Sequence, residues 1–365
     1  MHVSLAWLGR HVDLDGVNVE ELADRFTLGV AELEGVTRVA AVPNVVVGRV
    51  LSVEPIAGSK LTLCQVDVGK ERRSIVCGAP NVAAGQCVLA ALPGSKIQGQ
   101  EIVARAVKGV GSEGMLVSEQ ELGIGPESDG ILVLDDRAQP GTPLSALAPI
   151  EDVLFEIDNK SLTHRPDLWG HRGIAREVGA LLKRPLKPLE LDEQFGTEAP
   201  CEVAIEAPAG CAHYSALALA GIATAPSPLW LRVLLYRVGT RPIDNVVDAT
   251  NFVMLDLGNP VHAFDRRNIE GGRIVVRRAR DGERIVTLDG VERSLDPRDL
   301  VIADAARPVA LAGIMGGEDS GVTSRTSELL FEAATFDAAT VRVTAQRLGL
   351  RTEASARFEK SLDPA

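Results

Sequence analysis

Several kinds of residue and segment are scarce or missing in this 365-residue sequence. Aromatic residues make up 4% of the chain, and residues 39–149 contain no Phe, Trp or Tyr. No apolar run approaches the roughly 18 residues that a membrane-spanning helix needs, so we expect no membrane partner. Lys and Arg number 38 against 50 Asp and Glu, which argues against a general nucleic-acid-binding protein.

The cysteines and the N-terminus indicate a cellular compartment. The five cysteines form no C-x-x-C pair, so a zinc site is disfavoured and buried thiols in a reducing environment are favoured. The first 16 residues lack the basic segment and the long apolar segment of a signal peptide. We therefore expect a cytoplasmic protein.

What the chain does contain is typical of a soluble globular protein of two or three domains. Apolar residues make up 45% and charged residues 24%. The negative charge is uneven, because residues 1–38 carry 3 basic and 7 acidic residues, whereas residues 39–149 carry 9 and 11. The second segment is nearly neutral and can still present a local basic face.

The pattern of apolar and turn residues divides the chain. Residues 1–38 are predicted to be helical, with Asn18 and Glu21 forming a capping box. Between residues 39 and 149, five short runs rich in β-branched residues are separated by Gly and Pro, which predicts a small antiparallel barrel followed by a short helix.

Helix returns after the barrel segment. Residues 150–190 contain a helix that Pro185 is expected to end, and residues 187–200 are Pro-rich and acidic, which is typical of a linker. From residue 201 onward the pattern is α/β and rich in strands, with one helix near residues 227–239 that we expect Ser227 to cap.

Two motifs favour a structural interpretation over a chemical one. "GVGSEG" (109–114) matches G-x-G-x-x-G, but it follows a series of strands and lacks the acidic residue that binds a ribose, so a glycine turn is favoured over a nucleotide site. His164 and His171 are seven residues apart, so their imidazoles are not neighbours on a helix, and capping or packing is favoured over metal binding.

Polar residues in apolar surroundings are the candidates for chemistry. Asn251 and His262 flank a Gly-Asn-Pro turn, and each by itself would be a turn residue or a surface histidine. Glu332, within "LLFEAATF", is less usual because a buried, unpaired carboxylate is costly. A group of arginines either guides RNA phosphates or forms a solvated strand face. These are Arg273, Arg277, Arg278, Arg280 and Arg284.

The barrel segment resembles the tRNA-binding domain of several synthetase-associated proteins, an OB-fold. The resemblance is carried, in order, by Lys60-Leu61, Cys64-x-Val66-Asp67-x-Gly69, Ile75-Val76-x-Gly78-Ala79-x-Asn81, Pro93-Gly94, Gly111-Ser112-x-Gly114-Met115-Leu116 and Glu121-Leu122-Gly123. The segment departs from that family before Lys60 and at Val117. Such barrels combine a basic groove with aromatic stacking, and since aromatics are missing here, a packing role is as well supported as RNA contact. The candidate RNA-binding residues are Lys60, Arg105, Lys108, Arg277 and Arg278.

The whole chain resembles the beta subunits of bacterial phenylalanyl-tRNA synthetases. The motifs are "RPDLWGHRGIAREVGALL", "VVDATNFVMLDLGNPVHAFD", "GIMGGEDSGV" and "LLFEAATFDAATVRVTAQRLGLRTEASARFEKSLDP". The resemblance implies an α+β multidomain fold: residues 1–38 and 150–190 form one discontinuous domain, the OB-fold barrel over 39–149 is inserted in it, and a B3/B4-type editing domain covers 200–365. The family's subunit is longer than this sequence. The implied partners are an alpha subunit and phenylalanine tRNA. ATP and Mg²⁺ are expected in the holoenzyme, with no cofactor in this chain.

In that family a pocket hydrolyses tyrosine wrongly attached to phenylalanine tRNA. The resemblance assigns catalysis to His262 and Asn251. It assigns substrate contacts to Glu332, Thr250, Gly316, Pro260 and Ala354. A Glu332 carboxylate that accepts the tyrosine hydroxyl would be left unpaired by phenylalanine, which would favour removal of tyrosine. The alternatives are a non-catalytic tRNA-binding scaffold and, less favoured, an amino-acid-binding module.

Overall fold

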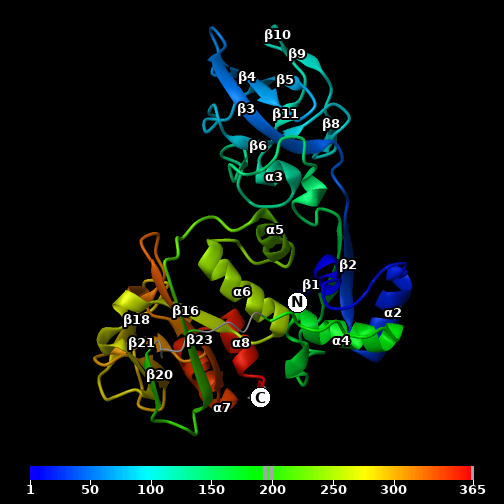
Figure 1. Ribbon diagram of the computed structural model, residues 1–365. Helices are drawn as coiled ribbons and strands as arrows, with labels where there is room; N and C mark the ends of the chain where they lie inside the picture. Colours follow the sequence, from blue (N-terminus) through cyan, green and yellow to red (C-terminus); the bar gives the residue numbers. More distant parts are fainter. Residues whose placement is uncertain (192–195, 197–200, 363–365) are drawn as a thin grey trace.

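The computed structural model describes residues 1–191, 196 and 201–362, and most of the predicted linker over 187–200 lies outside this description. The fold is a mixed α/β structure with a barrel-like sheet at one end (Figure 1). Two helices, α5 (Leu229–Arg237) and α6 (Asn245–Leu257), lie between that sheet and a strand-rich C-terminal region. Within the described residues, every helix is too short or too polar to cross a bilayer.

A three-stranded sheet joins the chain before the barrel segment to the chain after it. Strand β13 (Asp152–Ile157) runs antiparallel between β1 (His2–Ser4) and β2 (Leu33–Val39). Helices α1 (Leu5–Leu8), α2 (Val19–Gly29) and α4 (His171–Leu182) accompany it. Residues 1–38 are therefore not all helical, because strands lie near both ends of this segment.

One half of the capping box predicted for α2 is present, and α4 ends before Pro185, as predicted. The Asn18 side chain accepts a hydrogen bond from the backbone N–H of Glu21 at 3.1 Å, which satisfies a free helix donor. Helix α4 ends before Pro185, at Lys183, which adopts a left-handed conformation with φ of 56°. Leu22 and Phe26 of α2 pack into the same buried cluster as Phe155 and Ile174.

The barrel-like sheet has the strand order β11-β6-β3-β4-β5, and β12 pairs with β6. Its strands are β3 (Val45–Pro55), β4 (Thr62–Asp67), β5 (Arg72–Cys77), β6 (Cys87–Ala91), β11 (Met115–Leu116) and β12 (Val133–Leu134). Two hairpins accompany it, β7 (Lys96–Ile97) with β8 (Gln100–Glu101) and β9 (Arg105–Val107) with β10 (Val110–Ser112). Four of the five predicted runs are strands, and the fifth is divided between β8 and β9.

Two local predictions in this segment agree with the structure. Gly109, with φ of 80°, lies in the turn between β9 and β10, and Val110–Ser112 form β10, so "GVGSEG" begins in a hairpin turn rather than at the start of a helix. Helix α3 (Glu119–Leu122) follows, with a capping box in which Ser118 and Glu121 bond reciprocally.

The C-terminal region packs two sheets around one core. One sheet has the order β14-β17-β20-β21-β22, and the other has β15-β23-β16. The strands are β14 (Glu202–Ile205), β15 (Cys211–Ala220), β16 (Val261–Asp265), β17 (Arg273–Arg278), β20 (Leu300–Ala303), β21 (Pro308–Leu311), β22 (Met315–Gly316) and β23 (Glu328–Phe336), with a hairpin of β18 (Arg284–Val286) and β19 (Glu292–Ser294). Helices α7 (Ala338–Leu348) and α8 (Glu353–Phe358) follow β23.

The cap predicted for the helix after Ser227 is wrong. Helix α5 starts after Pro228 without a side-chain cap. The Ser227 hydroxyl instead donates to the Asp248 carboxylate of α6 at 2.6 Å, and both residues are buried. A tertiary hydrogen bond to a charged group competes successfully here with a local cap, because it also satisfies a buried carboxylate.

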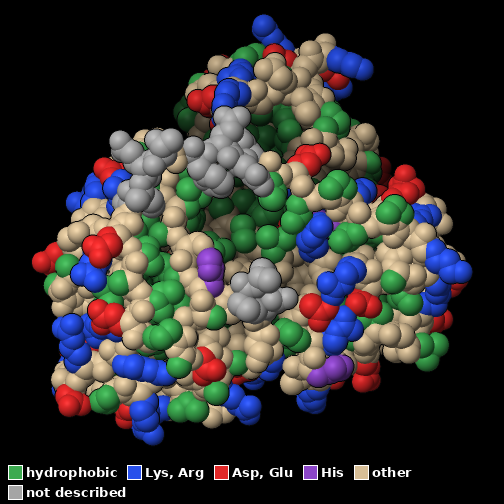
Figure 2. All heavy atoms as spheres, turned by 60° about the horizontal axis from the view of Figure 1, so that its bottom comes forward, with side chains coloured by type: hydrophobic (Ala, Val, Ile, Leu, Met, Phe, Trp, Pro, Cys, Tyr) green, Lys and Arg blue, Asp and Glu red, His purple; other side chains and the backbone are tan. Residues whose placement is uncertain are grey.

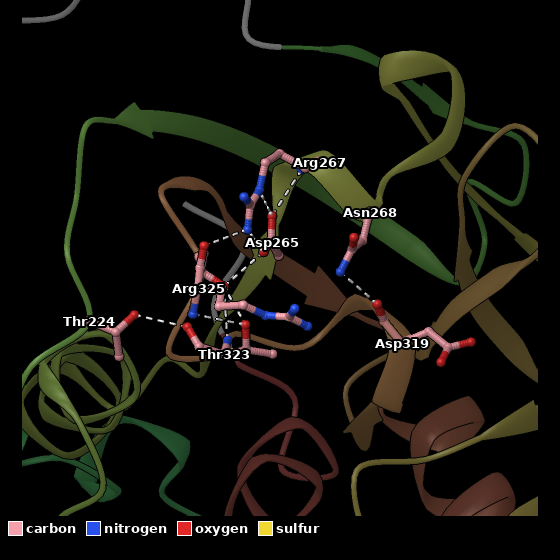
Figure 3. Close-up of polar contacts among 8 residues, drawn as sticks. Thr224, Asp265, Arg267, Asn268, Asp319, Thr323 and Arg325 are labelled. Atoms are coloured by element: carbon pink, nitrogen blue, oxygen red, sulfur yellow. Dashed lines mark hydrogen bonds and ion pairs between the residues drawn. The ribbon is translucent and has the colours of Figure 1, made fainter.

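A polar network fastens the loop after β22 to the end of β16 (Figure 3). The buried Asp265 carboxylate accepts hydrogen bonds from the Arg267 guanidinium at 2.7 Å and from the Thr326 hydroxyl at 2.8 Å. These bonds, that of Arg267 first, lower the pKa of Asp265. Asn268 donates to the carbonyl of Asp319, which holds the other end of the loop. The network therefore fixes the position of the strand that carries His262.

Candidate functional site

Glu332 lies in the middle of the central strand of the β15-β23-β16 sheet. Its direct neighbours across the two strand pairs are Ala216 on β15 and His262 on β16. Only 8% of the residue is exposed. The sheet thus encloses a carboxylate and places an imidazole directly opposite it.

A phenol already contacts this carboxylate. The Tyr214 hydroxyl donates to Glu332 Oε2 at 2.8 Å, and Tyr214 is itself buried. Burial raises the pKa of Glu332 to about 7, while the hydrogen bond from Tyr214 acts in the opposite direction. Burial, followed by the Glu332 charge, raises the pKa of Tyr214. Among the described residues, Tyr214 is the one hydrogen-bond partner of Glu332, so the carboxylate is not an unpaired group that waits for a ligand.

His262 is half-buried, with the Nε2 side of its ring enclosed. Its Nε2 atom is buried and has no hydrogen-bond partner among the described residues. Its ring meets the edge of Phe264, with 4.5 Å between the ring centroids. Burial lowers the pKa of His262 to about 4, so the imidazole is neutral at pH 7. A neutral ring of this kind can orient a water molecule, but it holds a proton weakly.

Gly316 leaves room for the imidazole ring of His262 because it has no side chain. A Cβ atom at this position would lie 2.6 Å from His262 Cε1 and 2.7 Å from Nε2, closer than non-bonded atoms approach. The backbone of β22 thereby comes within contact of the ring, as only glycine allows. Among the described residues no hydrogen bond joins His262 to Glu332, so the two groups are neighbours without forming a dyad.

A cavity of about 850 Å³ lies against this sheet, and both Glu332 and Thr250 are among the residues that line it. Phe331 and Ala333 line it as well, and because successive side chains of a strand point to opposite faces, the Glu332 carboxylate points to the other face of the sheet, toward Tyr214. Most of its other lining is apolar and includes Leu217, Val253 and Phe331. Figure 2 shows that one face of the molecule is hollowed, with hydrophobic side chains inside the hollow. An apolar cavity with few polar groups is the usual setting for an amino-acid side chain.

The remaining predicted pocket residues lie around the cavity and the core. The Thr250 hydroxyl donates to the Val247 carbonyl within α6 at 2.8 Å. Asn251 is half-buried, and its amide makes no hydrogen bond among the described residues. Pro260 is buried between α6 and β16, and Ala354 of α8 packs against the core of the C-terminal region. The structure therefore brings Glu332, His262 and Gly316 together, places Thr250 on the adjoining cavity, and does not show Asn251 or Ala354 in contact with the carboxylate.

The predicted RNA-binding residues fall into two classes. Lys60, Arg105 and Lys108 are exposed, and Arg105 lines a groove of about 590 Å³ on the barrel together with Leu61, the neighbour of Lys60. Arg277, in contrast, is buried and donates to both oxygens of Glu283 at 2.7 and 2.8 Å. Its guanidinium is not available to a phosphate, so neither a guiding role nor a solvated strand face describes this residue.

Arg278 is half-buried and donates to the carbonyl of Arg298 at 2.5 Å. His171, considered above as a packing residue, is fully engaged: its Nδ1 contacts the Leu255 carbonyl at 2.8 Å, and its Nε2 accepts from the Ser4 N–H at 3.2 Å. The described part of the chain contains no group of three His, Cys, Asp or Glu side chains arranged to hold a metal ion.

Tyr214 is the site residue that the sequence alone did not identify. The segment "CAHYSALALAG" alternates in the way of a strand, which places Tyr214 on the same face as Ala216 and Ala218. That pattern indicates an inward tyrosine. It does not indicate which strand pairs with β15, and the partner carboxylate lies 118 residues away.

Two regions of the chain match family models of known domains. Residues 210–365 match the family model of the B3/4 domain, and residues 45–143 match that of a putative tRNA binding domain. The chain is 46% identical over 371 residues to the phenylalanine–tRNA ligase beta subunit of Anaeromyxobacter dehalogenans and 45% identical over 376 residues to that of Moorella thermoacetica. The alignments cover 100% of this chain and 46% of each relative, so the chain spans about half the length of the curated relatives it matches.

A solved N-terminal fragment of the phenylalanyl-tRNA synthetase beta subunit from Pyrococcus horikoshii aligns with 56% of this chain and 62% of its own, at 18% identity and a TM-score of 0.31. This similarity is too low to support a structural comparison.

Proposed function

The chain belongs over its whole length to the family of phenylalanine–tRNA ligase beta subunits, and we propose that it removes tyrosine from wrongly charged phenylalanine tRNA. A site that selects phenylalanine through an apolar slot rejects tyrosine poorly, because tyrosine only adds a hydroxyl. A second site that recognises that hydroxyl corrects the error. The ligase reaction itself, with ATP and Mg²⁺, is proposed to need an alpha subunit.

The observation that carries the proposal is the buried Glu332 carboxylate, which lies opposite His262 on a strand that also lines an apolar cavity. It is 8% exposed and already accepts a hydrogen bond from a phenol, that of Tyr214. A carboxylate in this setting forms a charge-assisted bond with a second phenol, whereas a benzene ring offers it nothing. Hydrogen bonds to charged groups contribute about 1.5–3 kcal/mol, which corresponds to roughly ten- to hundredfold discrimination.

Hydrolysis of the ester requires water and stabilisation of an oxyanion, not a protein nucleophile. Water adds to the carbonyl carbon, the bond from that carbon to the ribose oxygen breaks, and the ribose oxygen takes up the proton that the water releases. His262, neutral at pH 7, is proposed to orient the water. The Asn251 amide is proposed to donate to the developing oxyanion, as its donors make no hydrogen bond among the described residues.

The barrel-like sheet is proposed to be an OB-fold that contributes to tRNA binding. It matches a tRNA-binding family model over residues 45–143, and its exposed Lys60, Arg105 and Lys108 lie in or near one groove. Because residues 39–149 contain no aromatic side chain, binding is proposed to rest on phosphate contacts rather than base stacking. Phenylalanine tRNA, an alpha subunit and a cytoplasmic location follow from the same family membership as proposals.

The decisive experiment compares deacylation of tyrosine-charged and phenylalanine-charged phenylalanine tRNA by the purified chain. We expect faster loss of tyrosine, and at least a tenfold loss of that preference in Glu332→Ala. Glu328→Gln is the matched control, because Glu328 lies on the same strand with its side chain 42% exposed. Equal rates for both esters, or no deacylation while tRNA binding is intact, would contradict editing and favour a scaffold.

A second variant tests the imidazole without changing any polar group. Gly316→Ala introduces a methyl group 2.6 Å from the His262 ring and must displace it. We expect slower tyrosine release by tenfold or more with little change in tRNA affinity. Gly111→Ala is the matched control, because a Cβ atom at Gly111 would meet no atom within 4 Å and this residue has no positive φ. Gly290→Ala would not serve, since Gly290 has a φ of 73°. A normal rate in Gly316→Ala would remove His262 from the mechanism.

A further inference from the structure

Tyr214 and Glu332 form a buried pair, of which the proposed reaction gives a role to Glu332 alone. The phenol and the carboxylate come from adjacent strands, β15 and β23, in the layer that faces the core. Their oxygens lie 2.8 Å apart, and both residues are at most 8% exposed. Such a short contact between enclosed groups fixes the rotamers of both side chains.

We propose that Tyr214 is a positioning residue of this site, whose hydroxyl holds Glu332 so that the carboxylate can accept the phenol of a tyrosine ester. The proposal rests on the function proposed above and deepens it. The hydroxyl binds Oε2, and among the described residues the carboxylate has no other hydrogen-bond partner. Two phenols, one resident and one arriving, then share one carboxylate.

The resident phenol also favours the charged form of the carboxylate. Burial alone favours the protonated acid, and the hydrogen bond from Tyr214 is the contribution that lowers the pKa of Glu332. The other titratable groups near the pair are the His262 imidazole opposite Glu332 and the thiols of Cys201 and Cys211 near Tyr214. His262 is neutral at pH 7, so it does not replace the effect of Tyr214.

If Tyr214 had a different role, removal of its hydroxyl would change the rate of tyrosine release in the opposite direction. If its ring merely occupied the place of the substrate phenol, removing the hydroxyl would free Glu332 and speed the release of tyrosine. In the positioning role, removal frees the carboxylate to rotate and to take up a proton. Its pKa then rises by about one unit, so at pH 7 the ionised fraction falls from about one half to about one tenth.

The test is the pH profile of tyrosine release by the wild-type chain and by Tyr214→Phe. We expect release to increase with pH through about 7 in the wild type. In Tyr214→Phe the rising limb should lie about one pH unit higher, with about fivefold slower release at pH 7 and weaker preference over phenylalanine. Tyr236→Phe is the matched control, as Tyr236 is the other of the chain's two tyrosines and lies 36% exposed on α5. In Glu332→Gln, addition of Tyr214→Phe should shift nothing further.

A second measurement tests the contact without any tRNA. With ¹³C at the ζ carbon of tyrosine, the chain gives two NMR signals, which Tyr236→Phe assigns. The Tyr214 signal should move with a midpoint near pH 7, and this movement should vanish in Glu332→Gln. No movement in the wild type would overturn the pairing even if Tyr214→Phe failed to fold.

The outcomes separate the two proposals. Tyrosine release by the wild type that is unchanged or faster in Tyr214→Phe overturns the role of Tyr214 and leaves editing intact. No release by the wild type overturns the proposed function, and the role of Tyr214 falls with it, whatever the NMR titration shows of the contact itself.

Discussion

The barrel segment and the C-terminal region are both built from short strands, yet they bury different kinds of side chain. Residues 39–149, all of them described, bury one charged residue, Glu119, within a core of Val, Ala, Leu and Cys. The described residues from 201 onward bury many more. These are Asp248, Asp256, Asp265, Arg277, Asp299, Asp304, Glu332 and Arg357.

The difference indicates which region holds polar groups in fixed positions and which region carries its charges on the surface. A buried charge is costly unless it is paired, so each one in the C-terminal region has a specific partner that fixes local geometry. The barrel keeps its charges on the surface, where they can contact a polyanion. Even Glu119 pairs outside the barrel, with Arg232 of α5, and so joins the two regions. The following predictions test this contrast, from the largest expected effect to the smallest.

Breaking a buried pair in the C-terminal region should cost the most stability. Arg277→Met leaves the Glu283 carboxylate, whose side chain is 15% exposed, without its two-bond partner. We expect the free energy of unfolding to fall by about 3–5 kcal/mol in urea denaturation, because the remaining charge is not compensated. Arg280→Met, at an exposed residue nearby, should change it little. Equal effects of the two substitutions would contradict a structural role for Arg277.

Glu332 should make stability depend on pH in a direction set by its raised pKa. The folded chain binds this proton more tightly than the unfolded chain, so the stabilisation is complete below pH 4.5 and is lost as pH rises through about 7. The change amounts to on the order of 3 kcal/mol. Unfolding of the wild type and of Glu332→Gln across pH 4.5–8 should differ by this slope, and parallel curves would show that the carboxyl is not buried in solution.

The opposite case is His262, whose pKa is lowered. Its contribution is present above pH 6.5 and is lost as pH falls through about 4. His262→Gln should therefore reduce acid unfolding of the chain below pH 6, measured by circular dichroism. The wild type and the variant should unfold alike in acid if water reaches the ring.

Breaking the ion pair between the two regions should reduce the free energy of unfolding by a smaller amount. Glu119→Gln weakens the pair with Arg232, whose side chain is 19% exposed, and we expect a loss of about 2 kcal/mol. Limited proteolysis between the barrel and α5 should become faster, with no change in a variant at exposed Glu127, such as Glu127→Gln. Equal protection in both would mean that apolar contacts alone join the regions.

Surface charges of the barrel should have the smallest individual effects. Lys60→Ala, Arg105→Ala and Lys108→Ala should each weaken tRNA binding modestly and reduce the slope of log affinity against log salt by about 0.7–0.9. Arg277→Met should leave that slope unchanged, because its guanidinium is occupied by Glu283. A salt-independent affinity would indicate base contacts instead of phosphate contacts.

Much of the fold was predictable from the sequence where local chemistry decides it. The Asn18 cap, the α3 capping box and the turn at Gly109 depend on residues a few positions apart. Four of the six strands of the barrel-like sheet follow from β-branched runs between turns. The strands β1 and β2 were missed because each completes its pattern only by pairing with β13, over a hundred residues away.

The site residues were likewise predictable only where a local pattern reveals them. Glu332 stood out as a carboxylate in an apolar run, and its enclosure follows from that pattern together with the sheet. Alternation along β17 was compatible with Arg277 on a solvated strand face, but it could not tell which face turns inward. Ser227 was expected to cap a helix because no local pattern reveals Asp248.

The sequence by itself determined the family, the order of the regions and the residue types from which the site is built, because motifs and hydrophobic patterns are properties of neighbouring residues. Only the tertiary structure decided that Tyr214 bonds Glu332, that Gly316 receives the His262 ring and that Arg277 faces Glu283. Each of these contacts depends on strand pairing or burial, and the free energy of a buried polar group is fixed by the partner that folding brings to it.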